Sequence, residues 1–129
     1  MNKEIRFVNT SKEWIICFEN KIPAWCYYND NPNNKDNVKL FNWYALNYIV
    51  ENKDRYKNLI DEIKLKKPKY SGIRYIDGNF YGLGLLSTYW LFEEKKQNMS
   101  FCIFKTIDNS HYKDGWNFKG CGFSLPFEV

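Results

Sequence analysis

The sequence predicts a single α+β domain, in which four to five strands form an antiparallel meander and a central helical segment packs on one face. Three observations indicate this class. Apolar side chains recur at three- and four-residue steps in the middle of the chain, which is typical of helices. The second half is rich in aromatic and β-branched residues, and pairs such as Asp77-Gly78 interrupt it as turn signals. The chain of 129 residues has the length of one domain, residues 1–129.

The first two predicted elements are short. Residues Lys3 to Val8 alternate between apolar and charged side chains, which predicts a strand. Thr10 and Ser11 are suited to cap a helix that follows, with Glu13 in its first turn. The buried face of that helix would be formed by Trp14, Ile15, Cys17 and Phe18, although the segment from Trp14 to Phe18 could equally be a strand.

A loop separates these elements from the clearest helical signal. The segment from Asn29 to Asn37 consists almost entirely of turn-forming residues, so we predict an exposed loop there. An apolar stripe then runs from Val38 to Ile49. We expect the helix to begin at this stripe, with Asp36 or Asn37 as its N-cap.

A second apolar stripe, from Tyr56 to Ile63, extends the helical segment. It either continues the first helix or forms a second helix after a break near Glu51 to Lys53. Pro68 then ends the segment, because proline lacks the backbone N–H and its ring clashes with the preceding turn.

The predicted sheet occupies the second half of the chain. Its turn signals are Asp77-Gly78, the polar run Glu93 to Ser100, and Asp114-Gly115. One strand is expected from Phe80 to Tyr89, where Gly82 and Gly84 mark a bulge or a close approach of another backbone segment. The segment from Cys121 to Val129 adds an edge strand.

The cysteines and the N-terminus both indicate a cytoplasmic protein. No stretch is apolar enough to span a bilayer, and the first residues lack the apolar core of a signal peptide, so we expect no membrane partner. Cysteines of cytosolic proteins are mostly reduced, and these form no CxxC pair. We therefore predict no metal site, no cofactor and four free, mostly buried thiols, at Cys17, Cys26, Cys102 and Cys121.

Catalytic motifs are not found in the sequence. Gly82-Leu83-Gly84 lacks the third glycine and the strand–turn–helix context of a dinucleotide fingerprint. The only histidine, His111, lies in a polar, turn-rich stretch, and we expect it in an exposed loop. Neither Cys102 nor Cys121 stands at a spacing that favours a pair with His111. We therefore predict no catalytic residue and a protein that is not an enzyme.

Positive charge is concentrated in one segment. Lys53 to Arg74 holds eight bases and three acids, a net charge of +5, whereas the whole chain carries +4. Such a local excess indicates either a binding footprint or a solvated helix face. The bases that we expect to face a partner are Lys64, Lys66, Lys67 and Lys69.

A second candidate binding feature is aromatic. Trp25, Tyr27 and Tyr28 precede the asparagine-rich loop, and aromatic side chains in such a place anchor protein partners or stack on nucleic-acid bases. The alternative is that they form a short strand that closes the end of the sheet.

These features favour a binding protein. A short, aromatic-rich, lysine- and asparagine-rich chain without catalytic motifs resembles the small inhibitors that mobile elements carry, namely toxin-immunity proteins and phage anti-defence proteins of the anti-CRISPR type. The resemblance implies stoichiometric occlusion of a partner protein, a toxin or a defence nuclease, that has an acidic surface. One alternative is a nucleic-acid-binding module that uses the basic segment from Lys53 to Arg74, and a second is a small enzyme that uses His111.

Overall fold

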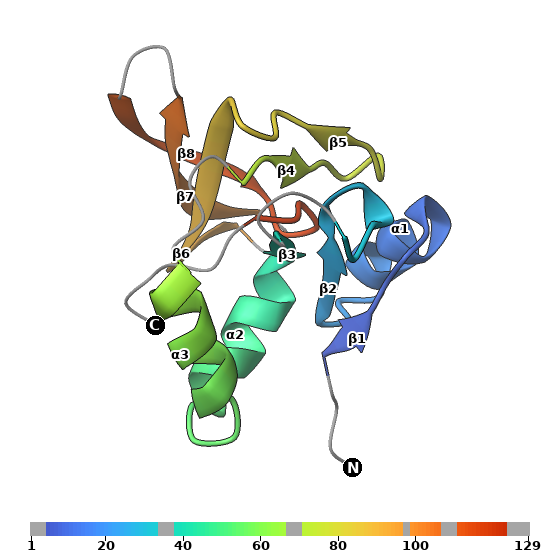
Figure 1. Cartoon of the computed structure of the whole chain (residues 1–129), viewed down its shortest axis with the longest axis vertical. Coiled ribbons are helices and arrows are strands. Elements are labelled where there is room, and N and C mark those ends of the chain that lie inside the picture. The colour runs from blue at the N-terminus through green and yellow to red at the C-terminus, as the bar shows by residue number, and fades with distance from the viewer. Residues whose placement is uncertain (1–4, 34–37, 67–70, 97–98, 107–110, 124–129) are drawn as a thin grey trace.

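A computed structural model describes residues 5–33, 38–66, 71–96, 99–106 and 111–123 of the chain. Side chains are described in these ranges except at 63–66, 87, 89, 91–96, 101–106 and 111–117. Within this part of the chain, three α-helices and eight strands form a mixed α/β fold with three small sheets. Figure 1 shows the two central helices on one side of the longest strands, with the N-terminal elements beside them.

The first sheet has the order β1-β2-β3. Strand β1 (Arg6–Phe7) pairs in parallel with β2 (Ala24–Tyr27), and β2 pairs antiparallel with β3 (Lys39–Phe41). A parallel pair needs a crossover connection, and helix α1 (Ser11–Glu19) supplies it. The predicted N-terminal strand is therefore present, but its pairing is not that of a meander.

Helix α1 begins where the sequence predicts. Thr10 is its N-cap, and the Thr10 hydroxyl accepts a hydrogen bond from the N–H of Glu13 at 3.2 Å. Trp14 and Cys17 face the core, whereas Ile16 lies on the exposed side. The segment from Trp14 to Phe18 is therefore helical, and the strand alternative is wrong.

The predicted apolar stripe from Val38 to Ile49 is divided between a strand and a helix. Its first part forms β3, and helix α2 (Trp43–Glu51) begins only after Asn42. The N-cap predicted at Asp36 or Asn37 is wrong, because the Asn42 side chain caps this helix. Strand pairing with β2 takes the first apolar residues of the stripe out of the helix.

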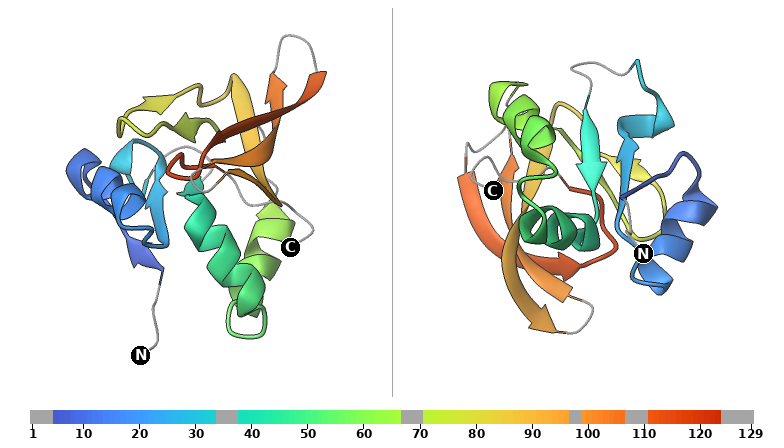
Figure 2. Two further views of the ribbon diagram at one scale, coloured as in Figure 1. Left: turned by 180° about the vertical axis from the view of Figure 1, so that it is seen from behind. Right: turned by 90° about the horizontal axis from the view of Figure 1, so that it is seen from below.

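Two separate helices follow one another, as one of the alternatives predicts. Helix α3 (Lys57–Lys66) begins after a turn over residues 52–56. Figure 2 shows α2 and α3 as a hairpin. Pro68, which we predict to end the segment, lies outside the described residues.

Asn42 joins helix α2 to the first sheet. Its buried Oδ1 accepts hydrogen bonds from the N–H groups of Ala45 at 2.9 Å and Ala24 at 3.1 Å. Its Nδ2 donates to the carbonyl of Ile22 at 2.9 Å. One side chain therefore satisfies backbone groups on both sides of the contact between the helix and β2.

We expect Asn42→Ala to lower the free energy of unfolding by about 2 kcal/mol, because a helix cap is lost and buried backbone groups lose their partner. Thr10→Ala is the matched control, since Thr10 caps α1 at an exposed position and its loss costs about 1 kcal/mol. Urea unfolding followed by circular dichroism measures both. Equal losses for the two caps would contradict the role of Asn42 as a tertiary link.

A β-hairpin forms at the predicted Asp77-Gly78 turn. It joins β4 (Ile73–Arg74) to β5 (Phe80–Tyr81), and Gly78 has a φ of +85°. The predicted strand from Phe80 to Tyr89 does not continue through the next glycines. Gly82 and Gly84 adopt φ angles of +79° and +82°, so they form a second turn instead of a bulge.

The longest strands form an antiparallel meander of β6 (Leu86–Lys96), β7 (Met99–Thr106) and β8 (His111–Phe118). A single meander of four to five strands is not confirmed, since the described strands divide into three sheets. The turn predicted at Asp114-Gly115 is wrong. These two residues lie inside β8, opposite Ile103 and Cys102, because cross-strand pairing overrides the local turn preference.

One hydrophobic cluster contains residues of α2 together with Phe41, Trp90 and Phe123. Trp90 of β6 is fully buried beside Phe123, and its Nε1 donates a hydrogen bond to the carbonyl of Phe41 at 3.0 Å. Backbone bridges join Phe41 to Phe123 and Arg74 to Gly122. In place of the edge strand predicted from Cys121, the described residues contain only these two isolated bridges, at Gly122 and Phe123. The rest of the predicted strand lies outside the described residues.

Candidate binding groove

A groove with a volume of about 410 Å³ lies between the first sheet and the start of α3. The sheet side of the groove is formed by Ile5, Trp25, Lys39 and Phe41, and the helix side by Arg55, Tyr56 and Leu59. The right-hand view of Figure 2 shows β3 and α3 next to each other. The groove therefore combines apolar walls with one basic side chain from each side.

Three aromatic rings extend the sheet side of the groove. Trp25 and Tyr27 stand two residues apart on β2 and share one face of the sheet. Phe7 is the partner of Trp25 in the parallel register of β1 and β2. The ring centroids of Phe7 and Trp25 are 4.8 Å apart, those of Trp25 and Tyr27 are 5.0 Å apart, and those of Phe7 and Tyr27 are 5.8 Å apart. We call this set of three residues the aromatic face.

The aromatic face reaches solvent. Phe7 is 46% exposed, and Trp25 and Tyr27 are half-buried. The three rings pack on one another, and Trp25 also stacks on Phe41 with a centroid distance of 6.5 Å. The rings are therefore held in place before any partner arrives.

Tyr28, which the sequence analysis groups with Trp25 and Tyr27, lies elsewhere. Its side chain is buried, and its ring centroid is 5.1 Å from that of Phe80. Its hydroxyl accepts a hydrogen bond from the N–H of Leu83 at 3.2 Å. Tyr28 joins the first sheet to the β4–β5 hairpin and is not part of the aromatic face.

Both basic side chains of the groove are oriented by aromatic rings. The Lys39 Nζ lies 5.6 Å from the centroid of the Trp25 ring, and the guanidinium of Arg55 lies 5.7 Å from the centroid of Tyr56. The Nη1 of Arg55 also donates a hydrogen bond to the Tyr48 hydroxyl at 3.2 Å. Positive charge is therefore positioned beside apolar surface on both sides of the groove.

The basic segment from Lys53 to Arg74 does not form one surface. Arg74 is fully buried and pairs with Asp30, so its charge is no part of a footprint. Arg55 of this segment lies at the groove. The backbone of Lys64 and Lys66 forms the end of α3, but the side chains of these two residues, and Lys67 and Lys69 entirely, lie outside the described part of the chain.

The cysteines whose side chains are described, Cys17, Cys26 and Cys121, are buried and form no disulfide with one another. Burial raises the pKa of Cys17, and it raises the pKa of Cys26 to about 12. Because the thiolate is the nucleophile, neither thiol is suited to covalent catalysis near neutral pH. Cys102 lies on β7, and its side chain is not among those that the structure describes.

His111 is the first residue of β8 and pairs with Thr106, so the prediction of a loop position is wrong. Its side chain is not among those described. No group of three or more His, Cys, Asp or Glu side chains is placed to hold a metal ion in the described ranges. No helix in the same ranges is both long and apolar enough to cross a membrane.

Comparisons of the chain with protein-family models, curated proteins and solved structures found no match. Sequence analysis selected Trp25 and Tyr27 but missed Phe7 and Lys39, and it included Arg55 only as one of eight bases. The alternation in residues 3–8 predicts a strand that contains Phe7. No local pattern, however, predicts that this strand pairs with β2 and so brings Phe7 beside Trp25.

Proposed function

We propose that this chain is a non-catalytic binding protein that inhibits a partner protein by stoichiometric occlusion, with the groove and the aromatic face at the centre of the contact. The observation that carries the proposal is the aromatic face beside Lys39 and Arg55. Aromatic side chains and arginine supply most of the energy of protein–protein contacts, and they do so from the middle of an interface. A partner that covers Phe7 removes an exposed apolar ring from water.

Preorganisation supports this role. The rings of the aromatic face are fixed by the register of β1 and β2 and by their mutual contacts. A side chain that is already ordered loses little conformational freedom on binding, so more of the contact energy appears as affinity. Occlusion needs no chemistry from the inhibitor, which agrees with the buried thiols of Cys17 and Cys26.

The proposed partner is a protein with an acidic surface. The chain carries a net charge of +4, and complementary charge raises the rate of association. The resemblance to toxin-immunity and anti-defence proteins makes a toxin or a defence nuclease the class that we propose. The aromatic face would then cover the active or substrate-binding surface of that enzyme.

Phe7→Ala tests the proposal against Tyr81→Ala as the matched control. Both residues belong to two-residue strands and both are 46% exposed, but only Phe7 is part of the aromatic face. We expect Phe7→Ala to weaken inhibition of the partner enzyme by about tenfold or more, and Tyr81→Ala to leave it unchanged. Circular dichroism confirms that each variant is folded.

The stoichiometry of inhibition completes this test. Titration of the partner enzyme, captured on the wild-type chain and purified, should reach full inhibition at one inhibitor per enzyme molecule. Complete inactivation by a small fraction of an equivalent would show turnover and contradict the proposal. Equal effects of Phe7→Ala and Tyr81→Ala on inhibition would show that the aromatic face does not take part in the contact with the partner.

A further inference from the structure

We propose that the partner segment entering the groove is acidic, and that Glu62 holds, in the free protein, the place on Lys39 that a partner carboxylate takes in the complex. This inference rests on the proposed function and concerns the chemistry of the occupant. Its geometric basis is the ion pair between Lys39 of β3 and Glu62 of α3, which joins the two sides of the groove.

The lining of the groove defines the occupant. Five of its described lining residues are uncharged and largely apolar, two are bases, and none is an acid. The bases come from opposite sides, Lys39 from the sheet and Arg55 from the turn before α3. A segment that places an apolar side chain between Trp25 and Leu59 therefore brings its flanking residues close to positive charge, which favours carboxylates at those positions.

The ion pair of the free protein is suited to exchange. The Lys39 Nζ and the Glu62 Oε1 are 3.3 Å apart, and the two side chains are 20% and 38% exposed. An ion pair with this much access to water contributes little to stability, so replacing Glu62 with another carboxylate costs little. The same contact becomes stronger when a partner excludes water from it.

Lys39 has a contact with the Trp25 ring in addition to its ion pair with Glu62. Its ammonium group lies over the Trp25 ring, and this contact is independent of Glu62. Arg55 is likewise oriented by Tyr48 and Tyr56. Its guanidinium places a second positive charge on the side of the groove opposite Lys39. Glu62 thus keeps Lys39 neutralised until an acidic segment displaces it.

Glu62→Gln is the most direct test. If a partner carboxylate must displace Glu62 from Lys39, removal of the Glu62 charge should raise the affinity of the chain for an acidic peptide. The probes are the acetylated and amidated hexapeptide Glu-Asp-Leu-Phe-Glu-Asp and its neutral counterpart Gln-Asn-Leu-Phe-Gln-Asn, titrated to millimolar concentration into the isotope-labelled full chain and followed by NMR. We expect shifts at the groove and tighter binding of the acidic peptide. Glu62→Gln should strengthen that binding by about threefold, which corresponds to the free energy that a partly exposed ion pair contributes.

Two further variants control for net charge and for packing. Glu19→Gln, at the exposed end of α1, changes the net charge by the same amount as Glu62→Gln and should leave the affinity within about twofold of wild type. Lys39→Met keeps the aliphatic stem over Trp25 and removes the ammonium, so it should weaken binding by about threefold.

The outcomes separate this inference from the proposed function. Equal binding of the acidic and neutral peptides, unchanged or weaker binding by Glu62→Gln, or no shifts at the groove overturns the inference. Loss of partner inhibition in Phe7→Ala leaves the proposed function standing in each of these cases. Tighter binding of an eight-nucleotide oligothymidylate than of the acidic peptide, lost in Phe7→Ala, would overturn both and assign the aromatic face to nucleic acid.

Discussion

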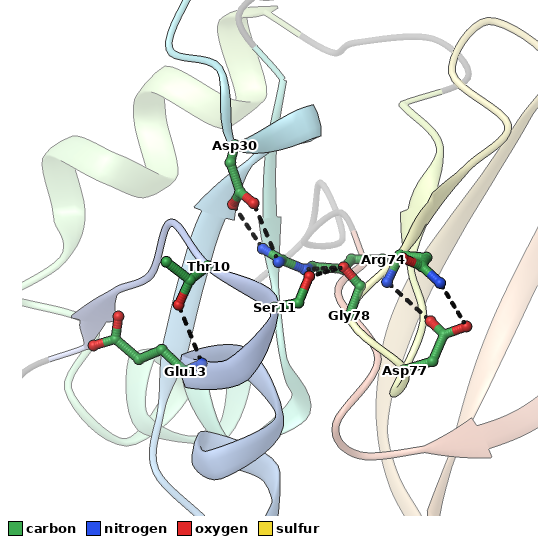
Figure 3. A network of polar contacts seen from close by, with 8 residues as sticks. Thr10, Ser11, Glu13, Asp30, Arg74, Asp77 and Gly78 are labelled. Atoms are coloured by element: carbon green, nitrogen blue, oxygen red, sulfur yellow. Dashed lines mark hydrogen bonds and ion pairs between the residues drawn. The ribbon is translucent and has the colours of Figure 1, made fainter.

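Asp30→Asn is expected to lower the free energy of unfolding by about 3 kcal/mol, because it leaves a buried guanidinium without its counterion. Arg74 is 0% exposed, and its Nη1 and Nη2 donate hydrogen bonds to the two Asp30 carboxylate oxygens at 2.8 Å and 3.2 Å. Figure 3 shows Asp30 reaching across to Arg74 from a segment far away in the sequence. The pair joins the short 3-10 helix Tyr28–Asp30, which follows β2, to the β4–β5 hairpin.

The rest of the Arg74 environment holds the guanidinium where it is. Its Nε donates a hydrogen bond to the carbonyl of Gly78 at 3.0 Å, and its charged group lies 4.3 Å from the ring centroid of Phe80 and 5.1 Å from that of Trp14. The charge therefore has no easy path to water when Asp30 is changed. Asparagine is the right replacement, because residue 30 has a φ of +53°, which asparagine tolerates better than alanine.

The double variant Asp30→Asn/Arg74→Met isolates the ion pair. Methionine fills much of the volume of the arginine stem and carries no charge, so we expect the double variant to be more stable than Asp30→Asn alone by about 1 kcal/mol or more. Urea unfolding of the wild type, both single variants and the double variant completes the cycle. Strictly additive losses would show that the two side chains are not coupled, and would contradict the prediction.

Gly72→Ala is expected to cost more than about 3 kcal/mol or to prevent folding. Gly72 has a φ of +71°, and a Cβ at this position would lie 2.5 Å from the Tyr28 ring, 2.8 Å from the carbonyl oxygen of Tyr81 and 2.9 Å from the nitrogen of Leu83. Two of these neighbours are backbone atoms, so the clash cannot be relieved by turning a side chain. Left-handed strain of about 1 kcal/mol adds to it.

Gly84→Ala separates the two contributions. Gly84 has a φ of +82°, but a Cβ there would meet no atom within 4 Å. We expect this variant to lose only the strain component, about 1 kcal/mol. Thermal unfolding by circular dichroism measures both variants, and recovery of soluble protein serves where Gly72→Ala does not fold. Similar losses at the two glycines would show that the close approach at Gly72 relaxes freely.

Local signals predicted the elements whose determining contacts lie within a few residues. The Thr10 cap and the Asp77-Gly78 turn each depend on bonds or backbone sterics inside one short segment, and both are found where expected. Asp114-Gly115 has the same kind of local signal but lies in a strand, since β7 supplies backbone partners across the sheet. The sequence did not predict the role of Asn42, which lies within an apolar stripe. Its hydrogen-bond partners Ile22 and Ala24 are distant in the sequence, so no local pattern indicates them.

The candidate site shows the same division. Trp25 and Tyr27 could be selected from the sequence, because aromatic residues beside a polar loop are a recognisable pattern. Phe7 joins them only through the parallel pairing of β1 with β2, and Lys39 meets Glu62 only where β3 lies beside α3. Arg74 is the opposite example. The sequence places it in the basic segment, but in the structure it is buried, paired with Asp30 and packed against two aromatic rings.

By itself, the sequence determined that this chain mixes helices and strands, that it is rich in aromatic residues and that it carries a net charge of +4. It also determined caps and turns, because these depend on the φ angles and side-chain hydrogen bonds of a few consecutive residues. Only the tertiary structure decided which rings and charges reach solvent and which meet across the groove. Exposure and proximity depend on packing between segments far apart in the chain, and no local pattern encodes that packing.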